Sequence, residues 1–210
     1  MSASVTTGGP VAALRRYARP RAPEERCDLC SLGLAPVHRH LLEVATRKIV
    51  CACDGCALRF HGVIGGRFKL IPRDARALPG FEVSEAQFEA LWEGLALPIN
   101  LAFFSFSTPA GKMMALYPSP AGATESLLPL ETWDMLVAAN PALGRMEPDV
   151  EALLVNRVGE ARDYLIAPID VCFELAGLIR MYWRGLSGGD DVWGRIAEFF
   201  ARVRREALDA

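Results

Sequence analysis

The stretch ERCDLCSLGLAPVHRHLLEVATRKIVCACDGCALRF, residues 25–60, carries five of the six cysteines and two of the three histidines of this 210-residue chain. It contains two CxxC pairs, Cys27/Cys30 and Cys53/Cys56, with 22 residues between them. Each pair can place two thiolates on one ion, because a tight turn brings the sulfurs to a metal–sulfur distance of ~2.3 Å. The spacing therefore predicts a metal site rather than a pair of disulfides.

The residues between the two pairs favour a β-hairpin of the zinc-ribbon kind. Residues 37–45 (VHRHLLEVA) and 48–53 (KIVCAC) are typical of strands, with Thr46-Arg47 near the tip. A loop symmetric about that dipeptide would pair Val44 with Ile49, Leu42 with Cys51, and His40 with Cys53. Alternate residues share one face of a strand, so His38, His40, Cys51 and Cys53 would line one side. A three- or five-residue loop would shift the register by one and scatter this set.

The segment offers more ligands than one tetrahedral ion needs. The simplest set is Cys27, Cys30, Cys53 and Cys56, and the possible additional or substitute ligands are Cys51, His40 and His38. Zinc is the first expectation, because structural Cys₄ zinc is the common use of paired CxxC motifs. Iron or an iron–sulfur cluster is the alternative, although the spacing lacks the Cys-x-His of a Rieske centre. The remaining histidine, His61, is expected to be structural.

The rest of the chain predicts an α+β domain. Ser84 and Gln87 form a capping box for a helix over about residues 85–93. Two hairpins are expected, one turning at residues 108–111 and one around Gly159-Glu160, and residues 117–126 are expected to be a loop. A helix over residues 130–139 ends at Asn140-Pro141, Asp170 caps the next helix, and an amphipathic helix closes the chain. We therefore expect a disordered tail at 1–22, a zinc-ribbon-like module at 23–66, and an antiparallel sheet packed with helices at 67–210.

Charge divides the chain into two unlike parts. Residues 15–76 hold 13 Lys/Arg and 6 Asp/Glu, a balance of +7, and the remaining residues hold 10 and 19, a balance of −9. The basic part could face an acidic partner, RNA or the acidic part of its own chain. No apolar run reaches membrane-spanning length, and the N-terminus lacks the apolar stretch of a secretory signal, so a cytoplasmic location is expected.

Catalysis is not favoured by the body of the chain. It has no histidine and one cysteine, Cys172, which is expected to pack in the core. A Cys–His or Ser–His–Asp device within it is therefore excluded, and no Walker or GxGxxG nucleotide motif is present. No catalytic residue and no organic cofactor is predicted.

Several stretches resemble an uncharacterised bacterial family encoded beside high-affinity, oxygen-tolerant nickel–iron hydrogenases. They are ERCDLC (25–30), HRHLLEVATRKIVCACDGCALRF (38–60), YPSPAGATESLLPLETW (117–133), EALLVNRV (151–158), PIDVCFELAGLIR (168–180) and WRGLSGG (183–189). The resemblance implies a role in hydrogenase assembly, maturation or electron transfer, with the seven Cys and His candidates above as the residues that matter.

Three functional hypotheses follow. The first is a non-catalytic metal-binding accessory protein that docks on a protein partner, a hydrogenase subunit or maturation factor. The second is a small iron or iron–sulfur redox protein using the same cysteines. The third is a zinc-ribbon nucleic-acid-binding regulator, and it is the weakest because the basic segment has few aromatic residues for stacking.

Overall fold

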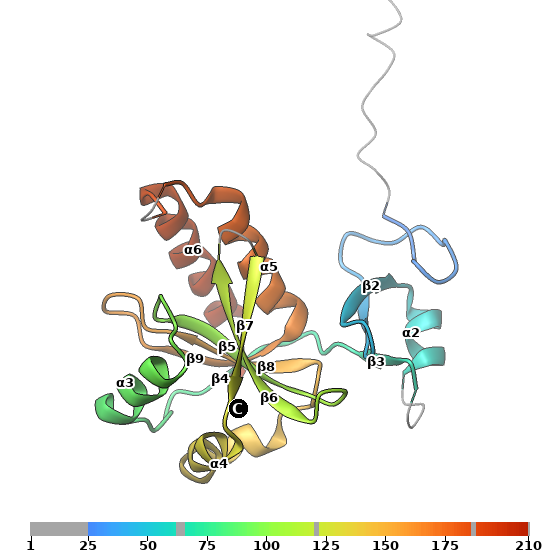
Figure 1. Cartoon of the computed structure of the whole chain (residues 1–210). Helices are drawn as coiled ribbons and strands as arrows, with labels where there is room; N and C mark the ends of the chain where they lie inside the picture. Colours follow the sequence, from blue (N-terminus) through green and yellow to red (C-terminus); the bar gives the residue numbers. More distant parts are fainter. Residues whose placement is uncertain (1–24, 62–65, 120–121, 186–187, 210) are drawn as a thin grey trace, which may run out of the picture.

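The computed structural model describes residues 25–61, 66–119, 122–185 and 188–209. The tail expected to be disordered, residues 1–22, lies outside them. Figure 1 shows a small three-stranded part beside a larger sheet flanked by helices. The α+β class predicted from the sequence, with a ribbon-like hairpin near the N-terminus, is confirmed.

The small part, called the ribbon module below, comprises residues 25–61 and 66–70. Its sheet has the order β2-β1-β3 and is antiparallel. The elements are β1 (Arg39–Glu43), β2 (Lys48–Ala52), α2 (Asp54–Phe60) and β3 (Phe68–Leu70). Because β3 pairs with β1, the sheet of the module extends past the boundary expected at residue 66. Its own core contains five buried residues, Leu41, Val50, Ala52, Ala57 and Phe68.

The hairpin register differs from the expected one by two residues. His40 lies opposite Cys51 rather than Cys53, and the four-residue loop runs from Val44 to Arg47. The turn closes early because Arg47 adopts the left-handed conformation, with φ 56°, and donates its N–H to the Glu43 carbonyl at 2.8 Å. A two-residue shift preserves the alternation of a strand, so His38 and His40 still share a face with Cys51.

The larger part is a seven-stranded sheet of order β10-β4-β9-β8-β5-β6-β7, antiparallel except for the short β10–β4 pair. The strands are β4 (Arg76–Ala77), β5 (Leu101–Ser107), β6 (Lys112–Ser119), β7 (Gly122–Leu128), β8 (Glu151–Asn156), β9 (Asp163–Pro168) and β10 (Leu208–Asp209). Every residue of β8 is buried, as expected for a central strand covered on both faces.

Helices cover both faces of this sheet (Figure 1). On one face lie α5 (Ile169–Tyr182) and α6 (Asp190–Glu206), and on the other lie α3 (Glu85–Gly94), α4 (Leu130–Ala139) and the 3₁₀ helix η1 (Pro141–Arg145). Neighbouring residues of one strand pack against the helices on opposite faces of the sheet. Phe103 packs with α5 and α6, whereas Phe104 packs with α3, because side chains alternate along a strand.

Most of the local predictions for the body are confirmed. The Ser84–Gln87 capping box is present, and both hairpins turn through glycines of positive φ, Gly111 at 61° and Gly159 at 58°. Glycine suits these positions because it has no Cβ to clash in the left-handed region. The final helix is amphipathic and buries Val192, Ile196 and three further apolar residues.

Two local predictions are wrong. The loop expected at residues 117–126 is not present at residues 117–119 and 122–126, since β6 continues to Ser119 and pairs with β7; residues 120 and 121 lie outside the described residues. Pro118 is tolerated because β5 pairs with β6 only as far as Leu116, so the missing N–H interrupts no ladder on that side. Asp170 does not cap α5 either. The cap position is Pro168, directly at the end of β9, and Asp170 is the second residue of the helix.

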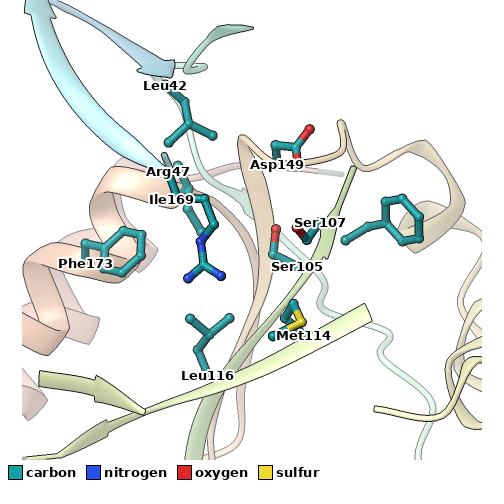
Figure 2. A pocket seen from close by; sticks show the side chains of 10 residues that line it. Leu42, Arg47, Ser105, Ser107, Met114, Leu116, Asp149, Ile169 and Phe173 are labelled. Atoms are coloured by element: carbon teal, nitrogen blue, oxygen red, sulfur yellow. The ribbon is translucent and has the colours of Figure 1, made fainter. Parts of the chain in front are cut away.

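The ribbon module is attached to the body through an apolar contact and a set of ion pairs. Leu42 is buried and belongs to the main core cluster of the body. Leu42 and Arg47 line a small cavity of about 30 Å³ together with Phe173 of α5 (Figure 2). Arg47 donates to Glu125, and Lys69 Nζ lies 2.8 Å from an Asp149 carboxylate oxygen.

The same pattern extends to the first strand of the body, where Arg76 donates to both carboxylate oxygens of Glu151 at 2.8 Å. Three cations of the basic segment therefore pair with carboxylates of the acidic part. One of the three possibilities for the basic segment, pairing with the acidic part of its own chain, is thus present for these three residues.

Candidate metal centre

The four cysteines of the two CxxC pairs converge. Ligand atoms of Cys27, Cys30, Cys53 and Cys56 all lie within 4.8 Å of one another. The Cys30 and Cys53 sulfurs are 3.7 Å apart, and all four thiols are free. Sulfurs around a tetrahedral ion with bonds of ~2.3 Å lie about 3.8 Å apart, so the group fits such an ion. These cysteines could therefore hold a metal ion.

Each cysteine pair sits on a tight turn. In the first, Ser31 adopts φ 63° and donates its N–H to the Cys27 carbonyl at 2.8 Å. In the second, Cys53 is the N-cap of α2, and its sulfur accepts the Cys56 N–H at 3.5 Å.

The two turns are tied together through Asp28 and Cys51. The Asp28 N–H donates to the Cys51 carbonyl at 2.9 Å, and the Cys51 N–H donates to the Asp28 carboxylate at 2.7 Å. Two hydrogen bonds thus tie the first turn to the end of β2, which leads into the second turn.

The thiols of the group differ in acidity. Burial disfavours the Cys27 thiolate, but backbone N–H groups, that of Cys53 first, outweigh it and lower the pKa of Cys27 to about 6. Burial and the neighbouring thiols raise the pKa of Cys56 to about 12. The Cys27 thiolate therefore forms readily, and its charge disfavours ionisation of the neighbouring thiols. A divalent cation would offset this repulsion, so that its binding would release protons from the thiols.

The remaining candidates form a second group. Ligand atoms of His38, His40 and Cys51 also lie within 4.8 Å of one another. Cys53, which was also predicted to lie beside these histidines, belongs to the four-cysteine group, because β2 ends at Ala52 and Cys53 is the N-cap of α2. His61 belongs to neither group and lies exposed at the C-terminal end of α2.

Asp170 is a site residue that sequence reasoning missed. Its carboxylate lies 2.6 Å from His40 Nδ1, across 130 residues of sequence, and this contact raises the pKa of His40. The sequence predicts Asp170 only as a helix cap, because no spacing rule connects it to the cysteine segment. Cys172, two residues further on, is fully buried as expected, and burial raises the pKa of its thiol.

Fold and site together define an α+β protein with an N-terminal ribbon whose four clustered cysteines could hold a metal ion. The chain belongs to the family of unknown function DUF5947, whose model matches residues 26–207. No curated protein and no solved structure matches the chain. Among the residues that the structure describes, none of the helices has the length and apolar character needed to cross a membrane.

Proposed function

We propose that this chain is a non-catalytic, cytoplasmic accessory protein whose ribbon module binds a structural zinc ion and docks on a protein partner. The observation that carries the proposal is the convergence of four thiols from two turns at the spacing of a tetrahedral site. The four-thiol set leaves no position for water on a tetrahedral ion, which is typical of structural rather than catalytic zinc.

Zinc has a clear physical task in this module. Its own core contains only five buried residues, two of them alanines. So small a core supplies little folding free energy, and small domains of this kind commonly fold by binding a metal. The ion would hold the two turns together and so order the surface around them.

That surface carries unusual apolar exposure. Leu32, Val37 and Leu58 are exposed by 59%, 78% and 76%, and all three belong to the ribbon module. Exposed apolar side chains on one small module suit a protein partner. The resemblance to a family encoded beside nickel–iron hydrogenases suggests a hydrogenase subunit or maturation factor as that partner.

Elemental analysis of anaerobically purified protein tests the metal assignment. We expect colourless protein with zinc bound by the four cysteines. Red-brown protein with visible absorption and bound iron would instead support the redox alternative. Protein purified anaerobically in zinc-containing medium that carries neither metal at the four cysteines would overturn the proposal.

Pull-down with the subunits and maturation factors of a co-encoded hydrogenase tests the partner. We expect capture by the zinc-loaded chain, and weaker capture by Leu58→Lys. Met181→Lys is the matched control, because Met181 is also exposed, by 62%, but lies on α5 of the body. Absence of capture by the zinc-loaded wild type would overturn the hydrogenase assignment. An equal loss of capture in both variants would contradict a contact specific to the ribbon module.

A further inference from the structure

We infer that the ribbon module contains a second metal site, formed by His38, His40 and Cys51, with an open coordination position. The geometry points to it independently of the four cysteines. His40 and Cys51 face each other across the β1–β2 ladder, and His38 lies two residues before His40 on the same face. The two imidazole rings are 4.9 Å apart and nearly perpendicular.

The state of His38 is the strongest observation. Its side chain is only 8% exposed, and its Nε2 has no hydrogen-bond partner among the described residues. Its other nitrogen, Nδ1, lies 3.0 Å from the Ala35 carbonyl oxygen. A carbonyl only accepts, so Nδ1 is the donor, and in the neutral imidazole Nε2 then carries a lone pair. A buried lone pair without a partner is costly, and a metal ion would use it.

His40 resembles His38 in that one ring nitrogen is held by an oxygen atom and the other is available to a metal ion. The Asp170 carboxylate holds its Nδ1 at 2.6 Å, which leaves Nε2 as the nitrogen free to bind. Histidine ligands almost always give their second ring N–H to a carboxylate or carbonyl, which fixes the tautomer and makes the ligand more basic. His38 has the carbonyl and His40 has the carboxylate, so both carry the outer partner typical of a ligand.

The donor set selects the ion. Two imidazoles and one thiolate suit a divalent first-row transition ion of borderline softness, and exclude calcium and magnesium, which take oxygen ligands. His38 is nearly buried, whereas the His40 side chain is 31% exposed and Cys51 is partly exposed. A water or a donor atom from a partner can therefore occupy the fourth position, unlike in the four-cysteine group.

This site would also couple the ribbon module to the body. Asp170 lies in the first turn of α5, so a ligand to the ion is oriented by a side chain of the other part of the molecule. Ile71 N–H further donates to the His40 carbonyl at 3.1 Å, where the chain leaves the ribbon. The second site rests on the proposed function in one respect, since the hairpin that carries it is ordered by the first ion.

Cobalt titration of the chelator-stripped full chain, under anaerobic reducing conditions, tests the site. We expect two Co²⁺ per chain, one with the intense charge-transfer absorption of four thiolates and one with the weaker absorption of a single thiolate. A variant combining His38→Ala and His40→Ala should bind one Co²⁺ and keep the four-thiolate spectrum. His61→Ala is the control and should still bind two.

The outcomes separate this inference from the proposed function. One Co²⁺ of four-thiolate type, unchanged in the double histidine variant, overturns the second site alone. Histidine-dependent uptake without any four-thiolate spectrum supports the second site and overturns both the four-cysteine site and its role in ordering the hairpin. A single ion with a mixed spectrum, lost in the histidine variant, overturns both in favour of one mixed site.

Asp170→Asn tests the site without removing a ligand. Loss of an outer carboxylate lowers metal affinity by about 10–100-fold, so the second site should weaken by that factor while the first is unchanged. Glu131→Gln is the matched control, because Glu131 is also the second residue of a helix that follows a proline, in α4. Affinity of the second site that is equal in both variants would overturn the role of Asp170.

Discussion

The six thiols of this chain differ in exposure, and this difference is testable residue by residue. Cys172 is fully buried, and burial raises the pKa of its thiol, whereas Cys30 is exposed. Alkylating reagents attack the thiolate, so both access and ionisation protect Cys172.

We therefore expect Cys172 of the native, metal-stripped protein to resist iodoacetamide while Cys30 reacts. Raising the pH toward 9, the ordinary pKa of a cysteine, should speed labelling of Cys172 in denatured protein but not in native protein. Mass spectrometry of tryptic peptides measures this. Labelling of Cys172 at equal rates in both states would contradict the burial described above.

Cys53 has two roles that one substitution separates. It is a proposed ligand and also the N-cap of α2. Cys53→Ser keeps a good capping side chain but lacks the thiolate, so it should lose the four-thiolate ion while α2 keeps its cap. Cys51→Ser is the control and should retain that ion. Metal analysis and cobalt spectra measure both, and retention of the four-thiolate spectrum in Cys53→Ser would contradict the ligand assignment.

Among the elements, the junction of β4 with the sheet depends on one buried carboxylate. Glu151, on β8, accepts two hydrogen bonds from Arg76 of β4 at 2.8 Å and a third from the Glu147 N–H at 2.8 Å. The Glu151 side chain is 8% exposed, so removal of its charge would leave the guanidinium of a largely buried pair without its counter-ion.

We expect Glu151→Gln to lower the free energy of unfolding by about 3–5 kcal/mol, the usual cost of breaking a buried ion pair by changing one partner. Glu174→Gln is the control, because Glu174 pairs with Arg202 at the surface, with side chains 53% and 37% exposed. Such pairs contribute about 0–1 kcal/mol. Urea denaturation measures both, and equal effects would contradict the difference in burial.

The whole molecule contains two cores of very different size. The body has large apolar layers on both faces of its sheet, whereas the ribbon module has five buried residues of its own and contributes Leu42 to the main cluster. The two parts should therefore respond differently to loss of metal, because in the proposed function only the smaller one depends on an ion for its order.

We expect chelation to abolish hydrogen-exchange protection at Leu41 and Val50 of the ribbon while Leu153 and Ile166 of the central sheet stay protected. These pairs are matched in burial, since all four side chains are at most 6% exposed. Exchange measured by mass spectrometry before and after chelation tests this. Unchanged protection in the ribbon would show that its fold does not depend on metal.

The local features of this fold could be predicted because each has a short-range cause. The two cysteine pairs, the Ser84 capping box, the turns at Gly111 and Gly159 and the amphipathic α6 all follow from neighbouring residues. The prediction of a loop at residues 117–126 was wrong for residues 117–119 and 122–126. It rested on the local pattern of Pro and Gly, whereas these residues are ordered by the pairing of β6 with β7.

By itself, the sequence determined the class of the fold and which seven side chains are candidate ligands, since residue type and spacing are local properties. Only the tertiary structure decided how these seven divide into a group of four cysteines and a group of His38, His40 and Cys51. The turn at Arg47 set the hairpin register, and the packing of α5 brought Asp170 to His40 across 130 residues. Contacts of that separation depend on how whole elements pack, and no local pattern encodes them.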